Sequence, residues 1–392
     1  MNCVAKQARL GIPSTKEGPR GPLAGLRVVE FSGLGPVPFA CMLLSDMGAD
    51  VVTVERAGKP LGDRTDITGR GRSVVLSDLK KPASRDQVLQ MLDHADVLVE
   101  GFRPGVMERL GLGPDEVAKR NPRLIYGRMT GWGQQGPLAQ AAGHDINYIA
   151  LTGALHAIGP AGGAPVPPLN LVGDYGGGSL YLVVGILAAL HEAQRSGLGQ
   201  VVDAAIVDGV LSLMSLFAAS TMRGTFTEQR GGNLLDGGAP YYGSYATDDG
   251  KYVSIGPIEP QFFADLCEQL GVEHSLRDAQ HDKTRWPALR AEFERIFRRR
   301  TRDEWSAMLE GGNACFAPVL ALSEAPSHAH HRWRQAFVDV EGSRHPAPAP
   351  RFSRTPSAIQ GPAPEQALTA AEILARWSAA SSTQVRPPRP RE

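Results

Sequence analysis

From Leu26 to about residue 130, short runs of β-branched residues alternate with segments whose apolar residues have helical spacing. Strands that alternate with helices are typical of βαβ units, which place the strands side by side in a mostly parallel sheet. We therefore predict an α/β protein whose first half is a Rossmann-like domain. Its expected strands are residues 26–31, 50–55, 73–77, 96–99 and 123–126.

The second half has a different pattern. Residues 171–220 are dominated by an apolar helical pattern, which a glycine-rich segment at 231–238 interrupts. Strand-forming residues on both sides of Asp248-Asp249-Gly250 then predict a hairpin over 241–255. A helical pattern from Trp286 onwards completes what we interpret as a smaller α+β domain.

Two capping boxes mark further helix starts, because a Ser or Thr followed three residues later by Glu satisfies two unpaired backbone donors. Thr301 and Glu304 form the first box, and Thr369 and Glu372 form the second. We expect the helix after Thr369 to pack back onto the first domain.

Composition excludes several classes of protein. Lys plus Arg and Asp plus Glu are both 41, so the chain has no net charge with which to hold nucleic acid or an anionic membrane surface. The four cysteines form no Cys-x-x-Cys pair, which argues against a disulfide scaffold or a zinc ribbon. The longest apolar run, 180–190, is about half of a membrane span. With no signal-peptide pattern at the N-terminus, we expect a cytoplasmic protein without a membrane partner.

The glycine-rich loop at 33–38 follows the first expected strand and precedes a helix, with Glu55 about twenty positions further on. This arrangement is similar to a dinucleotide-binding fingerprint. Pro38 stands where the third glycine would be, and Pro36 lacks the backbone donor that a phosphate requires. The loop therefore favours a tight βα turn over an NAD site.

Two further clusters each have two interpretations. Arginines near the expected strand ends could clamp phosphate groups or could simply be solvated surface residues, and spacing alone does not decide. The histidines at 328–331 could bind a metal, but without a nearby Cys or acidic partner a polar loop is favoured. The arginines in question are Arg56, Arg70, Arg72, Arg103 and Arg109.

Three segments carry candidate acid–base residues. His144 and Asp145 follow a glycine and precede an apolar helical run, so both lie at an expected helix N-terminus. Backbone N–H groups there can stabilise an oxyanion and keep an imidazole neutral, although a His in this position is more often structural. Asp174 lies among glycines at the start of an apolar helix, and Glu259 lies between two prolines. Sequence spacing cannot say whether these residues meet.

Several of these segments resemble a known family. Residues 26–31, 48–55, 95–106 and 131–137 are similar to the family III CoA-transferase superfamily, of the CaiB/BaiF type. Within that superfamily, residues 143–148, 233–242 and 258–262 resemble the α-methylacyl-CoA racemases. The resemblance covers residues 22–378.

The resemblance implies an interlocked homodimer, with an active site between the large domain of one subunit and the small domain of the other. We expect a disordered N-terminal extension at 1–22, a large CoA-binding domain at 23–205 and 335–378, a linker helix and glycine-rich loop at 206–239, a small domain at 240–334 and a disordered tail at 379–392.

The resemblance also implies roles for individual residues. His144 and Asp174 would be the two acid/bases, and Glu259 of the partner subunit would hydrogen-bond the His. Many members have a glycine where this chain has Val37, a difference that bears on the acyl channel. The expected CoA and thioester contacts are Arg56, Ser77, Asp78, Leu79, Lys80, Arg103, Arg109, Gly143, Asp145, Ile146, Asn147 and Tyr148.

The implied activity is interconversion of (2R)- and (2S)-2-methylacyl-CoA thioesters by 1,1-proton transfer through an enolate. It requires no metal or redox cofactor, and CoA is part of the substrate. The alternative on the same fold is a CoA-transferase that uses Asp174 as a nucleophile and forms mixed-anhydride and thioester intermediates. Transferases generally lack the His at position 144, so the racemase is favoured. An NAD-dependent oxidoreductase and a non-catalytic acyl-CoA-binding protein are weaker alternatives.

Overall fold

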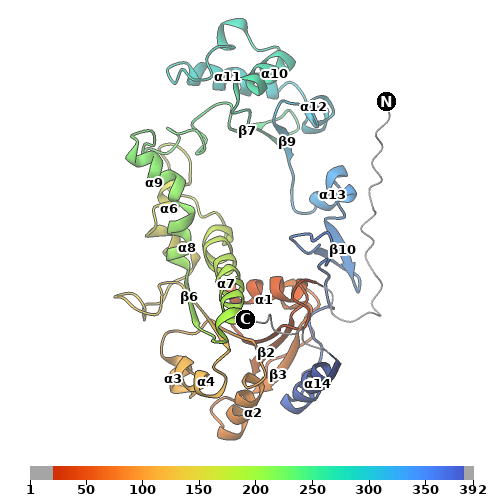
Figure 1. The fold of residues 1–392 in the computed structure, drawn as a ribbon. Helices are drawn as coiled ribbons and strands as arrows, with labels where there is room; N and C mark the ends of the chain where they lie inside the picture. The colour runs from red at the N-terminus through yellow and green to blue at the C-terminus, as the bar shows by residue number, and fades with distance from the viewer. Residues whose placement is uncertain (1–20, 384–392) are drawn as a thin grey trace. The chain divides into compact units, whose positions relative to one another are not determined.

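The computed structural model describes residues 21–383 and folds into two compact units (Figure 1). The first comprises residues 21–148, 170–210 and 335–383, and the second comprises 149–169 and 211–334. Residues 149–169, which we had assigned to the large domain, group with the second unit. There the Arg230 guanidinium donates hydrogen bonds to the carbonyl oxygens of His156, at 2.7 Å, and Gly163.

The predicted termini differ partly from the structure. Residues 1–20 and 384–392 lie outside the described residues. Gly21 and Pro22, which we had placed in the extension, belong to a turn whose Leu23 N–H donates to Met47 O at 2.9 Å. The final helix continues to Thr383, five residues into the predicted tail.

The first unit contains a six-stranded parallel sheet with the order β3-β2-β1-β4-β5-β6. The predicted strands are confirmed, but the fifth begins at Ile125 and not at Arg123. The sixth was missed, because five residues between two apolar helices do not interrupt a helical pattern. The bounds are β1 Arg27–Phe31, β2 Asp50–Arg56, β3 Ser73–Ser77, β4 Val97–Glu100, β5 Ile125–Thr130 and β6 Val201–Ala205.

Helices cover both faces of this sheet (Figure 1). One face packs against α2, α3, α4 and α14 through a core that includes Val52, Leu98 and Met91. On the other face, Leu182 and Ile186 of α7 lie against Gly127 of β5. The helices of this unit are α1 Pro36–Asp46, α2 Pro82–Leu92, α3 Val106–Arg109, α4 Pro114–Arg120, α7 Leu180–Ser196 and α14 Ala370–Thr383, with the π-helix η2 Leu171–Ser179, the 3₁₀ turn η1 Ile67–Gly69 and the hairpin β10 Phe337–Val340 and β11 Ser343–Pro346.

Among the described residues, one helical segment, Leu171–Ser196, is long and apolar enough to cross a membrane. Length and composition alone give this result, and a core helix of a globular domain meets the same criteria. The contacts of α7 with β5 and β6 are those of such a core helix.

The second capping box is confirmed: the Thr369 N–H and hydroxyl donate to Glu372, at 2.7 and 2.8 Å. The helix that it begins returns to the first unit, as predicted. Its Trp377 indole donates to Asp50 Oδ2 at 2.8 Å, and Arg376 pairs with the same carboxylate at 2.6 Å. Helix α14 therefore packs on one face of the sheet and is attached to the first residue of β2.

A buried arginine joins the N-terminal part of this unit to its C-terminal segment. The Arg70 guanidinium bonds both carboxylate oxygens of Asp46, at 3.1 and 2.5 Å, and both side chains are almost fully buried. Its third nitrogen donates to Pro346 O at 2.8 Å. Arg70 is therefore a structural residue and not the phosphate clamp that was one interpretation of the sequence.

The second unit has an antiparallel sheet, β7-β8-β9, that packs on α10, α11 and α12 around an aromatic core of Tyr245, Phe293 and Phe297. The predicted hairpin and first capping box are confirmed. The elements are α5 Asp145–Ala150 and α8 Ile206–Leu213 at its boundaries, α6 Ala154–Ala157, α9 Ser215–Met222, β7 Gly243–Ala246, β8 Tyr252–Ile255, α10 Pro260–Leu270, η3 His274–Leu276, α11 Trp286–Phe297, α12 Arg302–Leu309, β9 Phe316–Val319, η4 Ala325–Ser327 and α13 Ala329–Trp333.

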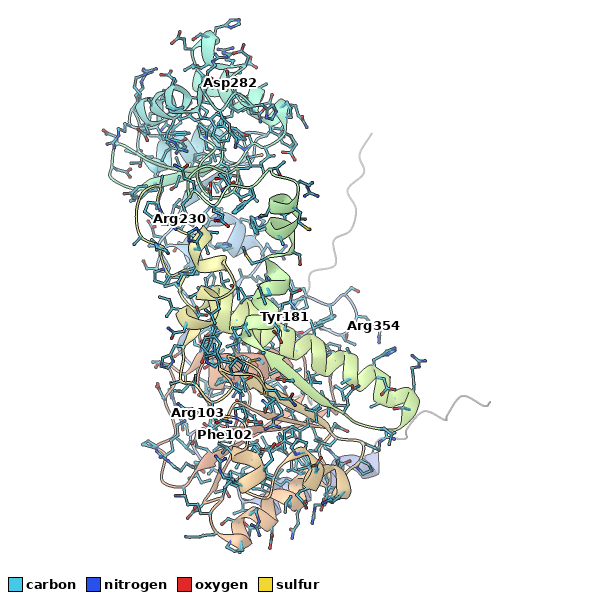
Figure 2. The ribbon with its side chains drawn as sticks, turned by 90° about the vertical axis from the view of Figure 1, so that its left-hand side faces the viewer. Phe102, Arg103, Tyr181, Arg230, Asp282 and Arg354 are labelled. Atoms are coloured by element: carbon cyan, nitrogen blue, oxygen red, sulfur yellow. The ribbon has the colours of Figure 1, made fainter. Side chains whose placement is uncertain are left out.

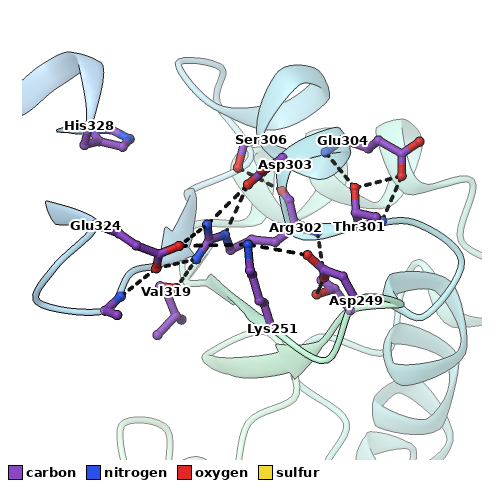
Figure 3. Close-up of polar contacts among 12 residues, drawn as sticks. Asp249, Lys251, Thr301, Arg302, Asp303, Glu304, Ser306, Val319, Glu324 and His328 are labelled. Atoms are coloured by element: carbon purple, nitrogen blue, oxygen red, sulfur yellow. Dashed lines mark hydrogen bonds and ion pairs between the residues drawn. The ribbon is translucent and has the colours of Figure 1, made fainter.

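A charged network surrounds the start of α12 (Figure 3). Arg302 is buried and bonds both oxygens of Glu324, each at 2.8 Å, and Val319 O at 3.1 Å. These bonds, chiefly that from Arg302, lower the pKa of Glu324 to about 2. Lys251 lies 3.9 Å from Glu324 and 3.8 Å from Asp249. The network connects α12 with β9 and with the turn before β8. The buried charge of Arg302 is paired with Glu324.

Candidate active site

The strand order places the candidate site at one edge of the large sheet. The chain crosses from one half of the sheet to the other between β1 and β4, and ligands of open α/β sheets bind beyond the carboxyl ends of strands at such a point. The segments that follow these two strands approach each other closely. A Cβ at Gly101, after β4, would lie only 2.9 Å from Val37 Cγ2, after β1.

Asp174 lies against the loop after β1. A Cβ built on Gly35 would lie 2.7 Å from Asp174 Oδ2, so only a glycine lets the loop come this close. The Ser179 hydroxyl adds a bond to Pro36 O at 2.7 Å, and the Phe39 and Tyr175 rings stack at 4.1 Å. Asp174 belongs to η2, a π-helical segment, and such segments are frequent at functional sites.

The His144 segment enters from the chain after β5. As predicted, α5 begins immediately after His144. The His144 N–H donates to Asn147 Oδ1 at 3.0 Å, and the Tyr148 hydroxyl donates to Gly143 O. The Tyr148 ring packs edge-on against Trp132, with centroids 4.8 Å apart. These contacts hold the N-terminus of α5 in one orientation.

The two segments meet through Asp145. Its Oδ2 accepts the backbone N–H of Asp174 at 2.7 Å. Burial raises the pKa of the Asp174 carboxyl, the Asp145 charge raises it further, and the Asn170 side chain and His144 oppose the rise. The structure therefore brings together His144, Asp145 and Asp174, which sequence spacing could not establish.

The expected CoA contacts occupy the ends of neighbouring strands. Arg56 and Ser77 are opposite each other at the ends of β2 and β3. The Arg56 side chain is exposed, whereas Ser77 Oγ is buried and has no hydrogen-bond partner among the described residues. Asp78, Leu79 and Lys80 continue from β3 into a turn closed by a bond from the Lys80 N–H to Asp78 Oδ1 at 3.2 Å.

Arg103 and Arg109 both follow β4, and both side chains are exposed (Figure 2 labels Arg103 and its neighbour Phe102). The Arg103 charge reaches Tyr148: burial raises the pKa of Tyr148, Asp174 and Asp145 add to the rise, and Arg103 opposes it. Ile146 and Asn147 lie on the first turn of α5, and both are exposed. The charge of Arg103 thus acts on Tyr148, in the segment that carries His144 and Asp145.

Glu259 belongs to the second unit. It is the N-cap residue of α10, which begins at Pro260, and its side chain is exposed. Its charge contributes to the raised pKa of Cys315, after burial of that thiol. The hydrogen bond from Glu259 to a partner's His stays a prediction.

Other sequence interpretations are corrected by the structure. Arg72 is buried, pairs with Glu30 at 2.5 Å and donates to the carbonyl oxygens of Pro38 and Thr68, so it supports the first loop and cannot clamp a phosphate. The Val37 side chain is 1% exposed and fills the space beside Gly101, so it does not line an open channel.

The histidines at 328–331 were expected in a polar loop without an acidic partner, but His330 and His331 belong to α13, His328 is its N-cap residue, and a glutamate lies nearby. His328 Nε2 lies 2.9 Å from Glu310 Oε1, and His331 Nδ1 lies 2.7 Å from Ala325 O. Within residues 21–379, no group of three or more His, Cys, Asp or Glu side chains is arranged to hold a metal ion.

Sequence reasoning missed Asn170, and it gave Gly35 and Arg72 other roles, in a tight βα turn and as a possible phosphate clamp. Gly35 and Arg72 contact residues distant in sequence, whereas Asn170 lies four positions before Asp174 and no motif indicated it. Gly35 has φ of +67°, which L side chains rarely adopt.

We expect Gly35→Ala to impair activity more than stability. The new methyl group would strain the backbone and push the Asp174 carboxylate away, and a displacement of about 1 Å at a reacting group can cost about 10²-fold in rate. Kinetics and a thermal unfolding curve would measure both effects. Gly58→Ala is the matched control, because it also has a positive φ (+85°) but has open space around the added carbon. Equal loss of activity in both variants would contradict the expectation.

The strand order defines a doubly wound α/β protein, and the candidate acid–base residues lie at its crossover point. The chain belongs to CoA-transferase family III, whose model matches residues 23–367. The predicted family is therefore confirmed.

Similar proteins agree with this assignment. The chain is 45% identical to alpha-methylacyl-CoA racemase from Mus musculus and 42% identical to the protein of that name from Homo sapiens, over 86% of this chain and 87% of each relative. The structure of a CAIB/BAIF family protein from Brucella suis has the same fold, with a TM-score of 0.79 at 24% identity. The match covers 91% of this chain and 100% of that protein.

Proposed function

We propose that this protein interconverts (2R)- and (2S)-2-methylacyl-CoA thioesters, which makes it an isomerase of lipid metabolism. The similarity to two proteins named alpha-methylacyl-CoA racemase supports the substrate class. The observation that carries the reaction type is the half-buried Asp174 carboxyl beside the His144–Asp145 segment. A carboxyl and an imidazole can each hold or release a proton, as the two faces of one carbon require.

In the proposed reaction, one of these groups removes the α-proton of the thioester and the other delivers a proton to the opposite face. His144 and Asp174 exchange roles for the opposite enantiomer. Burial raises the pKa of Asp174, which brings this acid closer to the basicity of an imidazole. Two groups of similar basicity suit a reaction whose two directions are nearly equivalent.

The intermediate is an enolate whose negative charge lies on the thioester oxygen. Backbone N–H groups at the N-terminus of α5, with that of Asp145 first, would stabilise this charge. The packing of Tyr148 on Trp132 supports the proposal, because it orients the start of the helix before any substrate binds. This mechanism needs no metal or redox cofactor.

We further propose that the exposed Arg56, Arg103 and Arg109 bind the CoA phosphates. The rest of the binding set would be Ser77–Lys80 and the start of α5. The active unit would be a homodimer in which Glu259 of the partner subunit orients His144. A cytoplasmic location, with no membrane or nucleic-acid partner, completes the proposal.

A family III CoA-transferase is the second candidate. There Asp174 would attack the acyl carbon as an anion, so a raised pKa at this carboxyl would work against it. A proton carrier uses both the protonated and the anionic form of the carboxyl, so a raised pKa suits one half of its task. This difference favours the racemase.

The test is to incubate the purified protein with a (2R)-2-methylacyl-CoA in deuterated water. We expect deuterium at the α-carbon, seen by NMR, together with loss of optical purity on chiral separation. Uptake with retained configuration, or no uptake across several acyl lengths, would overturn the proposal. In that case, trapping an Asp174 thioester with hydroxylamine would establish acyl-CoA transfer.

A further inference from the structure

A second carboxylate lies beside the candidate catalytic one. Asp145 reaches across from the start of α5 and accepts the Asp174 N–H at 2.7 Å, and the Gly173 N–H bonds it as well. Its other oxygen, Oδ1, is buried and has no hydrogen-bond partner among the described residues. The pair thus connects two segments that are 29 residues apart in sequence.

The surroundings of the two carboxyl groups differ. Burial raises the pKa of Asp145, and the backbone N–H groups of Asp174 and Gly173, which bond its carboxylate, oppose that rise. Asp174 has one side-chain partner, Asn170, and its Oδ2 lies beside Gly35. Residues 33–38, which cover it from the α1 side, include no titratable side chain. The Asp145 charge acts on the Asp174 carboxyl, and of two interacting carboxylates the one with fewer donors takes the proton.

We propose that Asp145 is a positioning residue: its carboxylate clamps Asp174 through the backbone, and its charge keeps a proton on the Asp174 carboxyl group. The other charged or titratable groups that face Asp174 are His144 and Tyr148, with Arg103 acting on Tyr148. Of these, Asp145 alone both bonds the Asp174 backbone and repels a negative charge on its side chain. The inference rests on the proposed function only for its effect on rate.

Asp145→Asn separates the two roles, because the amide oxygen can still accept the N–H bonds but carries no charge. Asp145→Ala removes both. Asp115→Asn, on an exposed carboxylate in the first turn of α4, is the matched control. Asp145→Ser offers a second neutral acceptor if the Asn variant does not fold.

The primary measurement is carbon-13 NMR of protein labelled at the aspartate carboxyl carbons, with the Asp174 signal assigned by its loss in Asp174→Asn. We expect the Asp174 titration midpoint to move to lower pH in Asp145→Asn, and not in the control. An unchanged midpoint in the folded neutral variants would overturn the proposal, even if Asp145→Ala were inactive, because Asp145 would then be only a backbone cap.

Kinetics provide a second readout that distinguishes this proposal from the proposed function. In Asp145→Asn, the limb of the pH–rate profile that belongs to Asp174 should move to lower pH in both directions of the reaction. In the direction that needs protonated Asp174, activity is then lost at a lower pH than in the wild type. In the opposite direction, which needs the Asp174 anion, activity is gained at a lower pH. Asp145→Ala should lose about 10²-fold or more through misplacement of Asp174. If the wild-type protein exchanges no deuterium, the proposed function fails, and the NMR midpoint still decides the role of Asp145.

Discussion

Asp174→Asn should lower the rate of racemisation by about 10²–10⁴-fold, the usual contribution of one positioned acid–base group. The amide keeps the size and one acceptor of the carboxylate but cannot carry the proton. His144 would remain able to remove the α-proton of one enantiomer and return a deuteron to the same face. We therefore expect this variant to exchange the α-proton of one enantiomer without inversion.

His144→Ala should give the mirror-image result, with exchange confined to the other enantiomer. Deuterium uptake by each pure enantiomer, followed by NMR and chiral separation, measures both variants. Circular dichroism spectra that match the wild type provide the control for folding. Full racemisation by either variant would refute the assignment of two acid/bases.

The second large effect concerns stability. Asp46→Ala should lower the free energy of unfolding of the first unit by about 3–5 kcal/mol, the cost of leaving one charge of a buried pair without its partner. Arg70 is fully enclosed and bonds both Asp46 oxygens, so water cannot replace the lost carboxylate. Urea unfolding followed by tryptophan fluorescence would measure the loss, because Trp377 packs in this unit.

An exposed pair of the same chemistry is the matched control. Arg120 also bonds both oxygens of Asp93, at 2.8 and 2.5 Å, but its side chain is 43% exposed. Asp93→Ala should therefore cost only about 0–1 kcal/mol. In addition, Asp46→Ala combined with Arg70→Met should be more stable than Asp46→Ala alone, since it removes the orphaned charge. Similar losses at both pairs would show that burial is not the cause.

Local patterns were enough to predict much of the fold. Strands β1, β2 and β3 are runs of β-branched residues that belong to the core, and the capping boxes at Thr301 and Thr369 depend only on residues three positions apart. The start of α5 after His144 was also predictable, because it follows from a glycine and the apolar helical run next to it. Strand β6 was not, because its place in the sheet depends on pairing with β5 and not on its own sequence.

The site divides in the same way. Sequence motifs identified His144, Asp174 and Glu259 as candidates and indicated the family, because those motifs are contiguous. The contact of Asp145 with the Asp174 backbone, the approach of Gly35 and the enclosure of the Arg70 and Arg72 side chains depend on packing between distant segments.

By itself, then, the sequence determined the alternation of strands and helices, the helix starts and the chemical types of the candidate acid–base groups, all of which are local properties. The tertiary structure alone decided which charges are buried as pairs and which backbone N–H the Asp145 carboxylate accepts. Those outcomes depend on distances and desolvation, which exist only once the chain has folded.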